Sequence, residues 1–425
     1  MPESVSAPGH RIQRRDKFRA YMRSFNPTAP ARYVIEAGLV YEDLHRMLFR
    51  NLAGRADLEP GSQQLLVGGI GSGKTTELLL AARWFTSQGE GLSLYIDITA
   101  ETDLTGLNSG SLLASFGIHL ANRISQNPAA PSEKLKALAA KIRDYAYGKQ
   151  ETIWVPEDDE DRFRDASEFD EDDEDERGHF TVRQTPGKLK PPLPALRRDI
   201  REIREPLEEL LGIAKAIHKD ILVIFDGLDR LPSPEKFWAV AHQDLRLFRD
   251  LKVSILVTAP ISVLFGAGVG HSVADQFDRV HHLSVLTPDP KQGFLQSVLR
   301  KRGGYNLLSE KEADSVCHYS GGVLRDLISL ARDAAEEAYV SEHDSVTSAD
   351  VETVVQQLGT AYLRGLGPEA IKTLVNLEKS KSFQISHPFN VELLVTRRVL
   401  EYSSTDFRVH PALLSVIPRT EPKRV

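Results

Sequence analysis

A short glycine-rich segment, VGGIGSGKTTEL, has the residue types and spacing of a phosphate-binding loop. Gly68 is followed after four residues by Gly73, Lys74 and Thr75, which matches G-x-x-x-x-G-K-[ST]; an apolar run precedes the loop and a helix-forming segment follows it. Such a loop points backbone N–H groups at anionic oxygens, and the positive end of the helix dipole adds to the attraction. The residues expected to hold the phosphates of a nucleotide are Gly68, Gly69, Ile70, Gly71, Ser72, Gly73, Lys74, Thr75 and Thr76.

Two side chains of this loop and two later carboxylates would complete a site for ATP and Mg²⁺. Lys74 would reach the β- and γ-phosphates, and the Thr75 hydroxyl would ligate Mg²⁺. Asp226 directly follows the apolar run ILVIF. We expect that strand to lie beside the strand before the loop, which would make Asp226 the second metal ligand, directly or through water. Asp229 would orient the attacking water, or else cap the next helix.

The elements that must position these residues alternate between strands and helices. Apolar, β-rich runs predict five buried strands, and helical apolar spacing fills the segments between them. The strands are expected at QQLLVGG, LSLYIDI (92–98), ILVIFD (221–226), VSILVTA (253–259) and RVHHLSVL (279–286). The pattern predicts an α/β fold, a three-layer P-loop NTPase core built on a five-stranded parallel sheet.

Composition divides the chain into further units. Residues 1–30 are predicted as a basic N-terminal arm, and residues 31–290 as the P-loop ATPase core. The core has one very long connection, whose acidic and proline-containing part at residues 151–192 we expect to be a disordered insertion. Residues 291–358 are predicted to be mostly helical, and the family resemblance described next implies that they form an α-helical lid. Residues 359–425 have the pattern of helices followed by a β-hairpin, which predicts a small α+β winged-helix-like domain.

The loop, the long connection and ILVIFDGLDR together resemble AAA+ ATPases and the related signal-transduction ATPases of the NACHT and STAND type. Most AAA+ proteins have a glutamate directly after the metal aspartate. This chain has Gly227 there, and Asp-Gly-Leu-Asp is the usual STAND-like form. The departure puts fast hydrolysis in doubt.

The resemblance implies roles for three further residues. Thr258 ends the fourth strand, where the family has a polar residue that senses the γ-phosphate; a threonine there also fits plain β-branched packing. Arg279 matches the arginine that reaches a neighbouring subunit's nucleotide, although an arginine at a strand start is usually solvated. Arg325, in SGGVLRDLISLAR, matches the lid arginine that meets the phosphates. Both arginines would spread positive charge onto a phosphoryl group in transit.

Composition restricts the remaining possibilities. The net charge is −7, but residues 157–176 hold 14 acidic residues and two arginines, so one segment sets the sign. Cys317 is the single cysteine, which excludes an internal disulfide and favours the reducing cytoplasm. The uncharged run at residues 253–270 is broken by proline and glycines, so we expect a buried strand and a loop and no membrane span.

Three functions are compatible with these features. The first is an ATP-driven conformational switch that assembles into a homo-oligomer and signals to a partner effector protein. The second is a DNA-binding initiator or loader ATPase, although the helix around residues 391–398 carries only Arg397 and Arg398 for phosphates or bases. The third is a nucleotide-binding scaffold that does not hydrolyse ATP.

Overall fold

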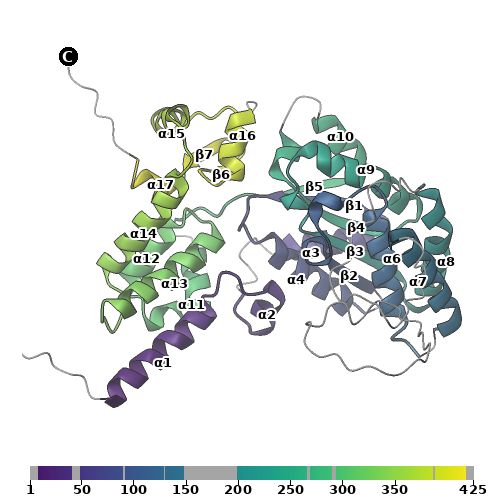
Figure 1. The fold of residues 1–425 in the computed structure, drawn as a ribbon, viewed down its shortest axis with the longest axis horizontal. Coiled ribbons are helices and arrows are strands. Elements are labelled where there is room, and N and C mark those ends of the chain that lie inside the picture. Colours follow the sequence, from purple (N-terminus) through teal and green to yellow (C-terminus); the bar gives the residue numbers. More distant parts are fainter. Residues whose placement is uncertain are drawn as a thin grey trace, which may run out of the picture.

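The structure is a computed structural model that describes residues 8–40, 48–89, 91–128, 130–147, 199–265, 269–289, 293–385 and 388–417. The acidic insertion predicted at residues 151–192 lies outside the described residues. Figure 1 shows a sheet flanked by helices in one lobe, and a helical bundle with a small hairpin in the other.

The central sheet has five parallel strands in the order β2-β3-β4-β1-β5. The predicted α/β class and the parallel sheet are confirmed. The predicted neighbour of the loop strand is wrong, because β4 lies between β1 and the strand that ends at Asp226. Crossover connections set strand order, and an apolar run does not encode it. The strands are β1 (Gln63–Gly68), β2 (Gly91–Asp97), β3 (Asp220–Asp226), β4 (Ser254–Ala259) and β5 (Arg279–Leu283).

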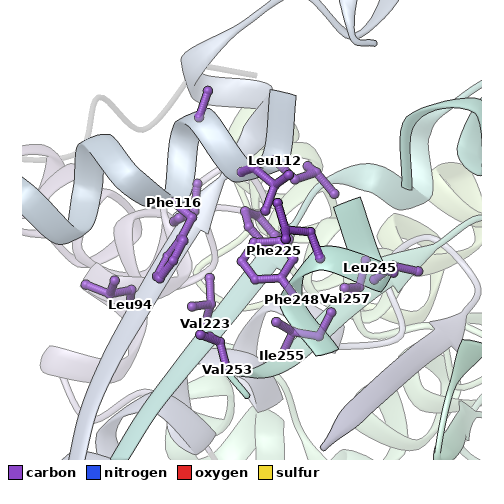
Figure 2. Close-up of a cluster of buried hydrophobic side chains, with 14 of the residues drawn as sticks. Leu94, Leu112, Phe116, Val223, Phe225, Leu245, Phe248, Val253, Ile255 and Val257 are labelled. Carbon is purple, nitrogen blue, oxygen red and sulfur yellow. The ribbon is translucent and has the colours of Figure 1, made fainter. Parts of the chain in front are cut away.

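Helices cover both faces of this sheet, because alternate strand residues face two separate hydrophobic layers. Leu65 packs in the layer with α6 to α9, and its neighbour Leu66 packs in the layer with α3 and α4. Figure 2 shows the first layer, where Phe225 of β3 lies near Phe248, which in turn contacts Phe116. The helices are α3 (Leu48–Leu58), α4 (Lys74–Ser87), α5 (Ile98–Glu101), α6 (Ser111–Ile124), α7 (Ser132–Tyr147), α8 (Arg201–Ile217), α9 (Pro234–Asp250) and α10 (Val269–Gln276).

A helical lid follows the sheet and includes a helix from the start of the chain. Its members are α11 (Phe294–Lys301), α12 (Glu310–Tyr319), α13 (Leu324–Val340), α14 (Ser348–Leu363) and α1 (Pro8–Ser24). Phe18, Tyr21 and Phe25 are buried in the hydrophobic core of this bundle, and Figure 1 shows α1 alongside it. The basic segment predicted as an arm is therefore, over α1, a packed part of the lid. The short helix α2 (Ala31–Glu36) then contacts α4.

The chain continues into the predicted winged-helix-like domain. Its helices are α15 (Pro368–Ser380), α16 (Pro388–Val395) and α17 (Pro411–Leu414), and its antiparallel hairpin pairs β6 (Val399–Ser403) with β7 (Asp406–Val409). The hairpin prediction is confirmed. This domain contacts the core through a hydrogen bond from the Val285 backbone N–H to the Glu401 carbonyl, at 2.9 Å. It contacts the lid through Arg397, whose guanidinium lies 2.7 Å from the Asp326 carboxylate.

The uncharged run at residues 253–270 begins with β4 and continues into a short 3-10 helix, Ile261–Leu264. Throughout the part of the chain that the structure describes, every helix is too short or too polar to traverse a bilayer.

Candidate nucleotide site

The phosphate loop opens into a cavity of about 740 Å³ between the core and the lid. This volume is in the range of small-molecule sites. Of the nine predicted loop residues, six line the cavity: Ile70, Gly71, Gly73, Lys74, Thr75 and Thr76. Gly68 and Gly69 contribute backbone carbonyls to Lys74 just behind the loop, and Ser72 is buried. The loop therefore lies where its sequence pattern predicts, at the carboxyl end of β1 and the start of α4.

Lys74 is buried at the back of the site and contacts three oxygens. It is 5% exposed, and its ammonium donates to the carbonyls of Gly68 and Gly69 at 3.0 and 2.9 Å. The third nearby oxygen is Oδ2 of Asp229, at 2.9 Å. An ammonium has three N–H donors, so these oxygens satisfy it fully. A phosphate oxygen that reaches Lys74 must therefore compete with the Asp229 carboxylate.

Asp226 lies beside Thr75, as predicted, even though its strand is not adjacent to β1. The Thr75 hydroxyl donates to Oδ2 of Asp226 at 2.7 Å, and the Gly227 N–H donates to Oδ1 at 2.8 Å. A residue that the sequence analysis missed, Tyr95 on β2, donates its hydroxyl to the same Oδ2 at 2.8 Å. Burial raises the pKa of Asp226, as does the charge of Asp229, while the three hydrogen bonds oppose that shift.

The donor set at this point fits Mg²⁺. Thr75 and Asp226 place a hydroxyl and a carboxylate side by side, and Mg²⁺ commonly uses one or two such protein ligands together with waters and substrate phosphates. Among the described residues, no group of three or more His, Cys, Asp and Glu side chains forms an all-protein cage for a metal.

Gly227 occupies the position at which most AAA+ proteins have glutamate, and the structure leaves no room there for a side chain. Its φ is +89°, in the left-handed region. A Cβ at this position would lie 2.5 Å from Cγ2 of Thr99 and 3.2 Å from Oδ1 of Asp97. Position 227 therefore cannot carry a carboxylate side chain without a shift of Thr99. Asp229 and Asp97 are acidic side chains that line the cavity near Asp226.

The lid reaches the phosphate loop at the start of α13. Arg325 lines the cavity, and a Cβ on Gly71 would lie 2.8 Å from the Cβ of Arg325, so only glycine permits this approach. Partial burial lowers the pKa of Arg325, and the positive charges of Arg397 and Arg230 lower it further. Arg325 and Arg230 both line the cavity, whereas Arg397 is paired with Asp326 outside it.

The structure does not bring Thr258 or Arg279 into this cavity. Thr258 is fully buried, and its hydroxyl lies 3.5 Å from the Phe225 carbonyl on β3. Arg279 is exposed and begins β5, paired in register with Gln64. That is the amino end of the sheet, opposite to the edge where β1 delivers the loop. Arg279 could therefore meet a nucleotide only across a contact with another subunit.

The far end of the cavity was missed by the sequence analysis. Its wall comes from residues 26–40, which contribute Pro30, Val34 and Val40, and from the lid residues Val298 and Ile328. This apolar surface suits a flat base more than a phosphate. No motif marks residues 26–40, because they become a wall only through packing against α4 of the core.

Two buried charged residues also line the cavity. Glu77 accepts a hydrogen bond from the Phe49 N–H at 2.9 Å, and burial raises its pKa to about 7. Arg302 is 8% exposed, donates to the Ser24 carbonyl at 2.8 Å, and has its pKa lowered to about 10 by burial. Their sequence positions gave no signal, since neither belongs to a motif: Arg302 follows two other basic residues, and Glu77 is one of several charged residues on α4.

No family model matches the sequence, and no curated protein matches it. Solved structures with a similar chain trace include the Aeropyrum pernix ORC2 protein in ADPNP–ADP complexes, at 13% identity over 86% of this chain and 88% of that chain, with a TM-score of 0.42. CDC6P from Pyrobaculum aerophilum is 13% identical over 88% and 82%, with a TM-score of 0.43. The Thermotoga maritima RuvB Holliday junction branch migration motor is 13% identical over 87% and 92%, with a TM-score of 0.38. Each TM-score is below 0.5, so these likenesses carry no argument about this chain.

Proposed function

We propose that this chain is an ATPase that binds Mg²⁺–ATP between its core and its lid and uses hydrolysis to switch the position of the lid. One observation carries the proposal: the Lys74–Asp229 ion pair, the Thr75–Asp226 hydrogen bond and Arg325 converge on a single cavity. A cation, a metal-ligand pair and a second cation from a separate domain are the parts that phosphoryl transfer requires.

In the proposed reaction, the γ-phosphate displaces Asp229 from Lys74. The freed carboxylate accepts a proton from the attacking water as the water oxygen bonds to the γ-phosphorus. The bond between that phosphorus and the β–γ bridging oxygen breaks, and ADP leaves with the electron pair. Lys74 and Arg325 stabilise the charge on the oxygens in transit. Mg²⁺ held by Thr75 and Asp226 would supply charge neutralisation at the β- and γ-oxygens.

The contacts around Arg325 support a switch as well as an enzyme. The next residue, Asp326, is buried and accepts hydrogen bonds from Tyr362 at 2.5 Å and from Arg397 at 2.7 Å. His410 lies 3.2 Å from the same carboxylate. A movement of the start of α13 toward the phosphates would therefore be passed to the winged-helix-like domain. ATP would bias the closed arrangement only if it binds that arrangement more tightly.

Turnover measurements on wild type, Lys74→Ala and Asp226→Asn test the proposal, with Lys136→Ala as a matched control because Lys136 is an exposed lysine on α7. We expect turnover in wild type and in the control, and at least a 100-fold loss in both site variants. Equal turnover in Lys74→Ala would refute the proposed site. If wild type and the control bind ATP but show no turnover, the chain would be a nucleotide-binding scaffold, the third of the functions considered above.

A separate proposal is that the chain forms a homo-oligomer in which Arg279 of one subunit reaches the nucleotide of the next. If Arg279 completes a neighbour's site, specific activity should rise with protein concentration, and Arg279→Ala should lose that rise while still binding ATP. Mixing Arg279→Ala with Lys74→Ala should then restore part of the activity, because each variant supplies what the other lacks. Failure of both variants to complement would argue against a site shared between subunits.

A DNA-handling ATPase is the second candidate function, and the winged-helix-like domain is the feature that favours it. The arginines next to its helix α16 are, however, already engaged. Arg397 pairs with Asp326, and Arg398 donates to the carbonyls of Tyr362 and Arg364 at 2.9 and 2.7 Å. DNA binding by this chain would therefore need cations from another surface.

A further inference from the structure

Helix α1 packs on the lid through one of its faces. Phe18, Tyr21 and Phe25 are buried there. Arg14 also contacts the lid: its guanidinium donates to the carbonyl of Tyr339 in α13 at 3.0 Å and to that of His343, just after α13, at 2.7 Å. These contacts fix the orientation of the helix, so the direction in which its other face points is also fixed.

Four arginines follow one another along α1 at intervals of four residues, each turned by about 40° around the helix axis from the one before it. All four are exposed: Arg11, Arg15, Arg19 and Arg23. At about 1.5 Å of rise per residue, neighbouring arginines are separated by about 6 Å along the axis and the row is about 18 Å long. Asp16 is the single acidic residue of α1, and it lies 3.5 Å from Arg15. Within the described residues, the other three arginines form no ion pair with a carboxylate.

We propose that this row of arginines binds the phosphate backbone of double-stranded nucleic acid without reading its sequence. Duplex DNA presents about one negative charge per 1.7 Å of axis, so a row about 18 Å long spans several phosphates. Guanidinium groups pair with phosphate through two parallel N–H donors, and a fixed helix loses little entropy when they do so. Gln13 is the one uncharged polar side chain described between these arginines, too few to read bases.

The surface does not depend on the proposed ATPase function, because no residue of the row lines the nucleotide cavity. It assigns DNA contact to the lid instead of the winged-helix-like domain. A lid that moves when ATP binds would then either move the bound DNA or change its own contacts with that DNA.

The test is fluorescence anisotropy with a labelled 30-base-pair duplex of arbitrary sequence, titrated with full-length protein between 50 and 200 mM KCl. One variant changes the four arginines of the row to glutamine. The matched control changes four exposed basic residues of α7 to glutamine, for the same loss of charge at another place: Lys134, Lys136, Lys141 and Arg143. Near-ultraviolet circular dichroism of each variant verifies that it is folded.

Each lost phosphate contact should lower the slope of log affinity against log salt by about 0.9. Four contacts give a slope difference of about 3.6, so between 50 and 200 mM wild type should lose about 100-fold more affinity than the row variant. The α7 control should keep the wild-type slope, and so should Lys74→Ala, which separates this proposal from the nucleotide site.

Three results with the duplex would overturn the proposal: no binding by wild type at 50 mM KCl, an unchanged slope in the row variant, or equal losses of affinity in both quadruple variants. Polyglutamate is the competing ligand. If it binds wild type as tightly as the duplex does, and the row variant no longer binds it, the row would be a site for an acidic protein segment and the nucleic-acid proposal would be overturned.

Discussion

Replacing Gly227 by alanine should destabilise the core well beyond the usual cost of a surface substitution. The φ of +89° costs a residue with a side chain about 1–2 kcal/mol. The added Cβ would meet Thr99 Cγ2 at 2.5 Å, an overlap that typically costs about 1–3 kcal/mol. Alanine regains about 0.4–1 kcal/mol from a stiffer unfolded chain. The free energy of unfolding should therefore fall by about 2–4 kcal/mol.

Urea unfolding followed by tryptophan fluorescence measures this change, because Trp84 on α4 and Trp238 on α9 report on the core. Gly365→Ala is the matched control: its φ is +78°, but no atom lies within 4 Å of the added Cβ. That variant should lose about 1 kcal/mol or less. Adding Thr99→Ser to Gly227→Ala removes the clashing methyl group and should restore part of the loss.

A Gly227→Ala variant no less stable than Gly365→Ala would refute the reasoning. Position 227 would then have room for a side chain, and the presence of glycine where most AAA+ proteins have glutamate would have no steric cause. If the prediction holds, the water-orienting group must lie elsewhere, and Asp229 is the candidate that the structure places beside Lys74.

Three further predictions concern the cavity. Asp229→Asn should bind ATP several-fold more tightly, because it removes the carboxylate that competes for Lys74, yet turn over at least about 100-fold more slowly. Calorimetry and phosphate release measure the two, and a parallel fall in both would contradict the base role; a helix cap is not the alternative, because Ser233 caps α9. The folded-state pKa of Glu77, about 7, lies above its ordinary 4.5, so the stabilisation from its protonated form is full below about pH 4.5 and is lost as the pH rises through 7. Between pH 5 and 8 the free energy of unfolding should therefore fall by roughly 2.5 kcal/mol on this account, and Glu77→Gln should remove that decline in urea titrations at the two pH values. Tyr95→Phe should leave folding intact but change the Mg²⁺ concentration at half-maximal turnover, because it removes a hydrogen bond to Asp226. An unchanged concentration would show that Tyr95 has no influence on the metal site.

The phosphate loop and the identity of the strands could be predicted because both are local. The loop needs glycines, a lysine and a threonine within eight residues, and each strand is one apolar run. Asp226 was placed correctly beside Thr75 for an incorrect reason. The strand order puts β4 between β1 and β3, but the parallel register still delivers the carboxyl ends of all these strands to one edge of the sheet.

Features that depend on packing between distant segments could not be predicted. The basic start of the chain contains Phe18, Tyr21 and Phe25, whose helical spacing favours a packed helix, but nothing local shows that the partner is the lid. Thr258 was expected in the nucleotide site because it ends a strand. The β4 register instead turns its hydroxyl toward a β3 carbonyl.

The central claim, that Lys74 and the lid hold ATP in one cavity, is tested most directly by calorimetric titration of Mg²⁺–ATP into wild type, Lys74→Ala and Arg325→Ala. Loss of a charge-assisted hydrogen bond costs about 1.5–3 kcal/mol, so each variant should bind about 10- to 100-fold more weakly. ATP that binds wild type, Lys74→Ala and Arg325→Ala with equal affinity would contradict the account.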